Sequence, residues 1–238
     1  DAGAHSDVTQ KLFDGVTAQS ALEKALANGT PKSAVGHLLG HSYWLQGELD
    51  RAEATLSNGG IADANRAYAN RILGRVHMDK GDLVAAQKVF ERALQQVPKD
   101  SQIWTDVARL RFVSADQKGA IDAVDYALKL DASNVRALEF RGRLMRSQFG
   151  VVAALPWFER ALQIAPNDIP VLEEYALTLG EVGRYRDMLT QAREIIAVDG
   201  NNAKAFCMQA VLAARAGNYQ LAKRILPRAG ATFNELPA

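Results

Sequence analysis

The sequence predicts an all-α solenoid in which six antiparallel helix pairs follow one another at a spacing of 34 residues. A pair whose second member is Gly or Ala recurs at this spacing, as Leu39-Gly40, Leu73-Gly74, Val107-Ala108, Arg141-Gly142, Tyr175-Ala176 and Gln209-Ala210. A second position recurs in step and is small in every repeat except at Met188: Ala52, Ala86, Ala120, Ala154, Met188 and Ala222. Between the two positions, four repeats carry a glycine suited to a tight turn: Gly47, Gly81, Gly183 and Gly217. Each repeat is therefore read as helix, turn, helix.

The six repeats start at residues 33, 67, 101, 135, 169 and 203 and fill residues 33–236, which we expect to form a single solenoid domain. The predicted helix pairs are 33–46 with 49–58, 67–80 with 83–97, 101–114 with 117–130, 135–148 with 151–164, 169–182 with 185–198, and 203–216 with 219–226. The glycines that follow Ser57 predict a short second helix in the first repeat.

The two ends of the array differ from its interior. Residues 1–32 are read as an N-terminal cap, with a helix around Ala18, Leu22 and Ala25 and a weaker one at 8–13. At the other end, Pro227 removes a backbone donor and should end the last helix at 226. No polar capping element follows, so we expect self-association through this end or continuation of the chain past Ala238.

These residues resemble the tetratricopeptide (TPR) signature W-x2-L-G-x2-Y, then A-x3-F, then P. The second repeat carries Leu73-Gly74, Ala86, Phe90 and Pro98, and the third supplies Trp104 at the signature's tryptophan position. The resemblance implies a right-handed superhelix of antiparallel helix pairs. It also implies a non-catalytic scaffold that binds a peptide or a partner protein in its concave groove.

Composition and motifs narrow the function classes. Lys and Arg number 28 against 27 Asp and Glu, so the overall charge gives no reason to expect a nucleic-acid partner. The one cysteine, Cys207, excludes an internal disulfide and a multi-cysteine metal site. Phosphate-binding, nucleophile-elbow and zinc-protease motifs are absent from the sequence. His37 and His41 have chelating spacing but no evident third ligand. We therefore expect neither an enzyme nor a cofactor nor a metal.

The candidate binding residues lie on the first helix of each repeat, on the side away from the packing stripe. At the ninth place of consecutive repeats stand His41, Arg75, Arg109 and Arg143. The full set of groove candidates is His37, His41, Trp44, Tyr68, Arg71, Arg75, Arg109, Phe112, Arg136, Arg143 and Arg146. Arginine forms bidentate pairs with carboxylates and stacks on aromatic rings, so this set predicts an acidic peptide or protein partner.

Three other functions stay open at this point. The chain could be an oligomerising structural module or a carrier of an anionic polysaccharide, in either case as part of a larger envelope or secretion assembly. It could also be the docking appendage of an enzyme domain that lies upstream or downstream. No apolar run is long enough to span a membrane, so we expect a soluble chain. The first residue is Asp1 and not Met, which leaves room for a signal peptide or lipid anchor removed from upstream.

Overall fold

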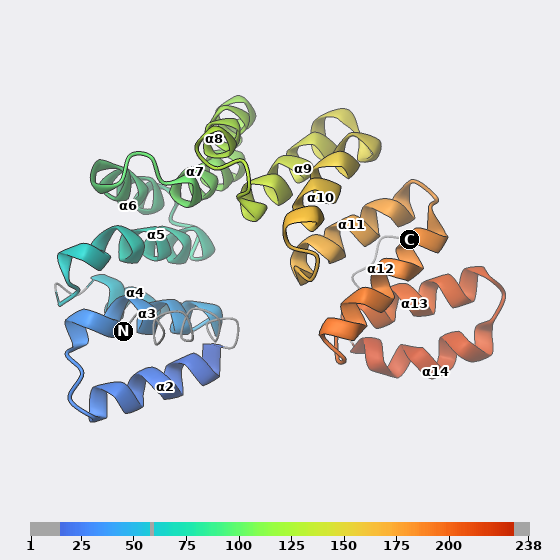
Figure 1. Cartoon of the computed structure of the whole chain (residues 1–238), viewed down its shortest axis with the longest axis horizontal. Helices are drawn as coiled ribbons and strands as arrows, with labels where there is room; N and C mark the ends of the chain where they lie inside the picture. The colour runs from blue at the N-terminus through green and yellow to red at the C-terminus, as the bar shows by residue number, and fades with distance from the viewer. Residues whose placement is uncertain (1–14, 58–59, 231–238) are drawn as a thin grey trace. The chain divides into compact units, whose positions relative to one another are not determined.

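The computed structural model describes residues 15–57 and 60–230, and within these ranges the secondary structure is helical throughout, with no strand. Its helices, labelled in Figure 1, are α2 (Gly15–Ala27), α3 (Lys32–Leu45), α4 (Leu49–Ser57), α5 (Asp63–Asp79), α6 (Leu83–Gln96), α7 (Ser101–Val113), α8 (Gln117–Leu130), α9 (Val135–Phe149), α10 (Val151–Ile164), α11 (Ile169–Glu181), α12 (Tyr185–Val198), α13 (Ala203–Arg215) and α14 (Tyr219–Ala229). The all-α fold of antiparallel helix pairs is confirmed.

The chain divides into two compact units, Asp1–Leu130 and Asp131–Ala238, and each is described by itself. In the N-terminal unit α3 packs on α4, α5 on α6 and α7 on α8, while α2 packs on α3. In the C-terminal unit the pairs are α9 with α10, α11 with α12 and α13 with α14. Successive first helices also touch within a unit, α3 with α5 and α5 with α7. Each unit is a stack of hairpins, as Figure 1 shows.

The recurring small residue has a direct packing reason. A Cβ built on Gly74 would lie 2.4 Å from Phe90 Cε1, and one on Gly142 would lie 2.7 Å from Phe158 Cε1. The two phenyl rings are 1% and 0% exposed, so the first helix of each pair must be glycine where it meets them. In the third repeat the partner is the smaller Val124, and the same place holds Ala108. The two positions compensate each other in volume.

The turns between paired helices follow the expectation at the four glycines and differ in two repeats. Gly47, Gly81, Gly183 and Gly217 all have φ between 75° and 79°. In the third repeat Ala115 itself takes the left-handed conformation, with φ 63°, which costs an L-residue roughly 1 kcal/mol. In the fourth repeat the left-handed residue is Gly150, one place later, so that α9 runs on through Phe149.

Most predicted helix limits hold to within two residues, and two do not. Helix α5 starts at Asp63 instead of 67. Helix α14 continues through Pro227 to Ala229 instead of ending at 226. Pro227 and Lys223, whose carbonyl loses its donor, are both exposed, so water can satisfy that carbonyl at little cost. The short second helix of the first repeat is confirmed, since α4 has 9 residues while α6, α8, α10 and α12 have 14 each.

The terminal helices pack as follows. Ala18 and Leu22 of α2 are buried against the core of the N-terminal unit, as a capping helix requires. The weaker helix expected at 8–13 lies outside the described residues. At the other end Ala229 is buried against Phe206 and Cys207 of α13, while Leu221 and Leu226 are half-buried. Between residues 15 and 230, apart from 58–59, no helix is long and apolar enough to cross a membrane.

Candidate functional site

Helices α3 and α5 bring five of the predicted groove residues into one cluster. The Nδ1 atom of His41 and the hydroxyl of Tyr68 share a hydrogen bond of 2.5 Å. The guanidinium of Arg71 lies 5.2 Å from the centre of the Tyr68 ring, and that of Arg75 lies 5.2 Å from the centre of the Trp44 ring. Cations over aromatic faces are attracted by the ring quadrupole, so these contacts order the arginines. We call this surface the first-helix face and define it by His37, His41, Trp44, Tyr68, Arg71, Arg75, Arg109 and Phe112.

The face continues onto α7 through two bridges from α5. Arg75 donates to Asp106 Oδ1 at 2.6 Å, and Arg71 donates to Oε1 of Gln102. Asp106 is fully buried, and its Oδ2 has no hydrogen-bond partner among the described residues. The structure therefore uses Arg75 to hold a buried carboxylate of the next repeat. Arg109 and Phe112 lie further along the same helix and are half-buried.

The remaining contacts explain the burial of the aromatic residues. The indole Nε1 of Trp44 donates to Asp79 Oδ2 at 2.6 Å, which ties α3 to the C-terminal end of α5. His37 is 3% exposed, and its ring meets the edge of Tyr68 at 5.4 Å between centroids. His37 therefore belongs to the floor of the face and not to its surface.

Burial and the nearby cations keep His41 in its neutral form. Burial is the main cause that lowers the pKa of His41 to about 3, and the charges of Arg71 and Arg75 contribute in the same direction against the opposing Asp106. His41 is therefore neutral at physiological pH. It shares one hydrogen bond with the Tyr68 hydroxyl, as donor or as acceptor, and adds no charge to the face. Burial also raises the pKa of Tyr68, which keeps its phenol neutral.

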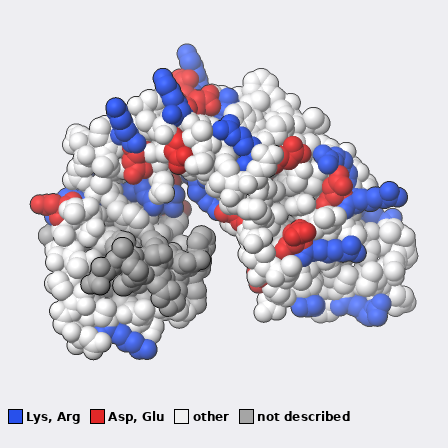
Figure 2. All heavy atoms as spheres, in the orientation of Figure 1, with Lys and Arg blue, Asp and Glu red and all other residues white. Residues whose placement is uncertain are grey.

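The predicted groove residues of the C-terminal unit lie in a different electrostatic setting. Arg136 pairs with Asp168, and Arg143 lies 3.5 Å from Glu139 one turn earlier on α9. Arg146 pairs with Glu181 and lies 3.5 Å from Glu174. The chain's own carboxylates therefore meet all three arginines. On the face drawn in Figure 2, several of the described basic and acidic side chains likewise stand beside one another.

The side chains that pair with the groove residues were not predicted from the sequence. Asp106 could have been noticed, because it is an acidic residue between Thr105 and Val107 on the buried side of a first helix. A buried carboxylate requires a cation, and Arg75 stands almost one repeat before it. Gln102 and Asp79 are exposed polar residues with no comparable signal. Across the described ranges, no group of three or more His, Cys, Asp or Glu side chains could hold a metal ion.

Comparison with known families identifies the repeat. Residues 66–110 match one family model described as a tetratricopeptide repeat, and residues 106–169 match a second with the same description. Among curated proteins, the mouse (Mus musculus) protein O-mannosyl-transferase TMTC1 is 26% identical over 157 residues, which are 63% of this chain. The chain spans only 16% of that protein's length.

Solved structures agree on the fold. A structure from the functional characterization of Pseudomonas aeruginosa pilF has a TM-score of 0.63 at 19% identity and covers 84% of this chain and 94% of its own. YrrB, described as a TPR protein with an unusual peptide-binding site, has a TM-score of 0.51 at 20% identity and covers 70% and 86%. The Cut9–Hcn1 hetero-tetramer of APC/C has a TM-score of 0.71 at 12% identity and covers 94% of this chain and 48% of that one. The 34-residue period, the hairpin stacks and these matches together identify residues 66–169 as tetratricopeptide repeats.

Proposed function

We propose that the chain is a non-catalytic protein-interaction scaffold whose first-helix face binds an acidic peptide segment of a partner protein. Tetratricopeptide repeats serve as protein-interaction scaffolds, and this chain is built from them. The observation that carries the finer proposal is Arg71. This residue is 8% exposed, and the hydrogen-bond partner of its guanidinium, Gln102, is neutral.

A buried cation without a counter-ion is costly, and a bound carboxylate would relieve that cost. Among the described residues Arg71 makes no hydrogen bond or ion pair with a carboxylate. The charges of Arg71 and Arg75 point the same way, because they add to burial in lowering the His41 pKa although Asp106 is close by. An anionic group placed here gains a charge-assisted hydrogen bond.

The aromatic side chains supply the apolar part of the proposed contact. Trp44 and Tyr68 are half-buried and keep part of their rings accessible, with Arg71 and Arg75 stacked on them. Aromatic and arginine side chains dominate the energetics of protein interfaces. A peptide that alternates acidic and apolar residues would therefore meet both kinds of group.

The predicted groove arginines of the C-terminal unit differ from Arg71 because they already have acidic partners within the chain. Arg136 and Arg146 have acidic partners in the next repeat, and Arg143 has one on its own helix. A ligand carboxylate would have to compete with these partners. The proposal therefore places the acidic ligand on the N-terminal unit.

Fluorescence anisotropy with a labelled peptide of alternating Glu and Leu tests this proposal. A peptide with Gln in place of Glu is the matched neutral probe. We expect Arg71→Gln to weaken binding of the acidic peptide by about 1–3 kcal/mol, and added salt to weaken it further. Arg143→Gln, in the C-terminal unit, should leave it unchanged.

Equal binding of the two peptides, or no effect of Arg71→Gln, would contradict the proposal. Competition by an anionic polysaccharide, such as polygalacturonate, with no preference for the peptide would favour the polyanion carrier instead.

A second candidate function, an oligomerising module, rests on the C-terminal end. Of the residues of α14 only Ala229 is buried, while Leu221, Ile225 and Leu226 are half-buried. Repeat arrays with an incompletely covered end associate through it. Sedimentation should then show a concentration-dependent dimer that Leu221→Gln weakens, whereas a strict monomer at all concentrations would rule this function out.

A further inference from the structure

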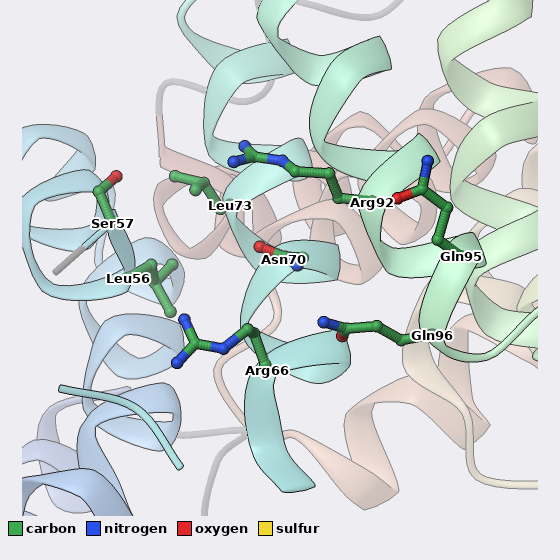
Figure 3. Close-up of a pocket in the computed structure, with 8 residues that line it drawn as sticks. All are labelled: Leu56, Ser57, Arg66, Asn70, Leu73, Arg92, Gln95 and Gln96. Atoms are coloured by element: carbon green, nitrogen blue, oxygen red, sulfur yellow. The ribbon is translucent and has the colours of Figure 1, made fainter. Parts of the chain in front are cut away.

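The N-terminal unit also has a recess on the side of α5 away from the first-helix face. It has a volume of about 320 Å³ and is enclosed by the end of α4, by α5 and by α6. Figure 3 shows the residues that line it, which are Leu56, Ser57, Arg66, Asn70, Leu73, Arg92, Gln95 and Gln96. At 3.6 residues per turn, Asn70 and Leu73 lie opposite Arg71 and Arg75 on α5. We call this recess the α4–α6 pocket.

The pocket reaches beyond the end of a shortened helix. Helix α4 stops at Ser57 after 9 residues, whereas α10, the equivalent helix three repeats later, has 14. Leu162 and Gln163, in the last turn of α10, form a wall of the equivalent recess. In the α4–α6 pocket the helical end of α4 contributes only Leu56 and Ser57, and the lining extends to Arg66, Gln95 and Gln96 instead.

The lining combines an apolar floor with unused polar groups. Leu56 and Leu73 are 6% and 4% exposed and form the floor. Arg66 donates to the Ile61 carbonyl at 2.9 Å and pairs with Asp63, which is almost fully exposed. In the part of the chain that the structure describes, four other lining residues make no side-chain hydrogen bond or ion pair: Asn70, Arg92, Gln95 and Gln96. In Figure 3 Asn70 projects between Arg92 and Gln96.

The equivalent recess in the C-terminal unit carries the opposite charge. It measures about 370 Å³, and Glu159 and Glu194 stand at the places of Ser57 and Arg92. Its Glu159 already accepts a hydrogen bond from the Tyr175 hydroxyl at 2.9 Å, and burial together with this carboxylate raises the pKa of Tyr175 to about 12. Thus the recess of the N-terminal unit is basic, and most of its polar groups have no partner among the described residues, whereas the equivalent recess of the C-terminal unit is acidic and its Glu159 is already hydrogen-bonded.

We propose that the α4–α6 pocket binds the carboxylate of an extended peptide, with Arg66 and Arg92 gripping the carboxylate and the amides of Asn70, Gln95 and Gln96 pairing with the peptide backbone. Carboxamides can both donate and accept, which is what a peptide backbone requires. Guanidinium groups suit a carboxylate because they bind it in two parallel hydrogen bonds. A volume of this size is at the lower end for ligand pockets, which fits a few residues of peptide. This site is separate from the first-helix face and does not depend on it.

Side-chain NMR tests the proposal on the full chain. The probes are acetyl-Ala-Glu-Ala-amide, its isosteric control acetyl-Ala-Gln-Ala-amide, and trialanine with a free C-terminal carboxylate. We expect the Glu probe to shift the side-chain amide resonances of Asn70, Gln95 and Gln96, and the Gln probe to shift them little. Trialanine tells whether a terminal carboxylate or a side-chain carboxylate is preferred.

Variants separate this site from general charge effects. Arg92→Gln should weaken binding of the Glu probe roughly tenfold, because a charge-assisted hydrogen bond is lost. Lys88→Gln removes the same charge from an exposed place on α6 that does not line the pocket, and should change nothing. The swap Ser57→Glu, Asn70→Leu, Arg92→Glu installs the residue types that the equivalent recess already carries as Glu159, Leu172 and Glu194 in the fourth and fifth repeats. It should abolish binding.

Equal shifts with the Glu and Gln probes, or full binding in the Arg92→Gln variant, would overturn the proposal. Arg71→Gln, which tests the first-helix face, should leave these amide shifts unchanged. The two proposed sites can therefore be tested, and rejected, independently of each other.

Discussion

At the scale of single residues, His41 reports the electrostatics of the first-helix face. Its pKa of about 3 in the folded protein lies below the 6.5 of an unfolded chain, so between these values the unfolded state binds the extra proton. The stability that neutral His41 contributes is complete above pH 6.5 and is lost as the pH falls toward 3. The groups facing it from α5 and α7 are Tyr68, Arg71, Arg75 and Asp106.

We therefore predict that His41→Gln flattens the pH dependence of unfolding between pH 6.5 and 4. The wild-type chain should lose up to about 1.4 kcal/mol more per pH unit than the variant over this interval. Urea titrations at several pH values measure the difference, and the carboxylates common to both proteins cancel in it. Parallel pH profiles would contradict the pKa assigned to His41.

A second residue-scale prediction concerns the ion pair between Arg75 and Asp106, in which the side chains are 22% and 1% exposed. Arg75→Ala leaves a buried carboxylate without its cation and should destabilise the N-terminal unit by about 3 kcal/mol. Asp106→Asn in the Arg75→Ala background should recover part of this loss, because the uncompensated charge is removed. Denaturant unfolding gives both values, and additive costs for the two changes would argue against the coupling.

This second prediction also changes how binding data are to be interpreted. From its place in the repeat alone, Arg75 would be taken for an unpaired cation of the groove. Weaker binding in an Arg75→Ala variant would then be assigned to the loss of a contact with the ligand. Since Arg75 holds Asp106, weaker binding in Arg75→Ala can follow from altered packing between α5 and α7. Arg71→Gln avoids this difficulty because its own partner is the neutral Gln102.

At the scale of helix pairs, the contact between Gly74 and Phe90 sets how closely α5 and α6 approach. Gly74→Ala should destabilise the fold by about 1–3 kcal/mol, because the new methyl group would overlap a phenyl ring that is 1% exposed. This cost exceeds the gain in helix propensity of up to about 1 kcal/mol. Thermal or urea unfolding measures the outcome.

The third repeat suggests a second substitution that should restore the stability lost in Gly74→Ala. Adding Phe90→Val to Gly74→Ala reproduces the Ala108 and Val124 pair and should recover stability relative to the sum of the single changes. A double variant no better than that sum would show that the volumes of the two positions are not coupled.

At the scale of the whole molecule, the C-terminal helix should be the least protected part of its unit. Repeats depend on their neighbours for stability, and among the described helices α14 packs mainly on α13. The contacts of α14 include those of Ala229 and Ile225 with the cluster around Phe206. They also include Arg228, whose guanidinium lies 3.8 Å from the centre of the Phe206 ring and donates to the Gly200 carbonyl. Amide hydrogen exchange should be faster in α14 than in α11 or α12, and faster still in Arg228→Ala. Uniform protection across the C-terminal unit would refute this gradient.

By itself, the sequence determined the repeat, and with it most helix limits and the residue types at the helix contacts. The reason is that the small residue, its large partner and the turn glycine are local requirements of every hairpin, so they recur with the period. The exceptions are local too. Pro227 was expected to end a helix and does not, because its carbonyl partner faces solvent, and the start of α5 lies four residues before the periodic position.

The electrostatic state of the candidate site was decided only by the tertiary structure. The residues on the first-helix face could be named from their places in the repeat, and whether they bind a partner stays a prediction. Which arginines already have an acidic partner depends on side chains about one repeat away, such as Asp106 for Arg75 and Asp168 for Arg136. The α4–α6 pocket likewise needs three helices at once, because α4, α5 and α6 each contribute part of its lining. Pairing and enclosure depend on distances between repeats, which a pattern along the chain does not contain.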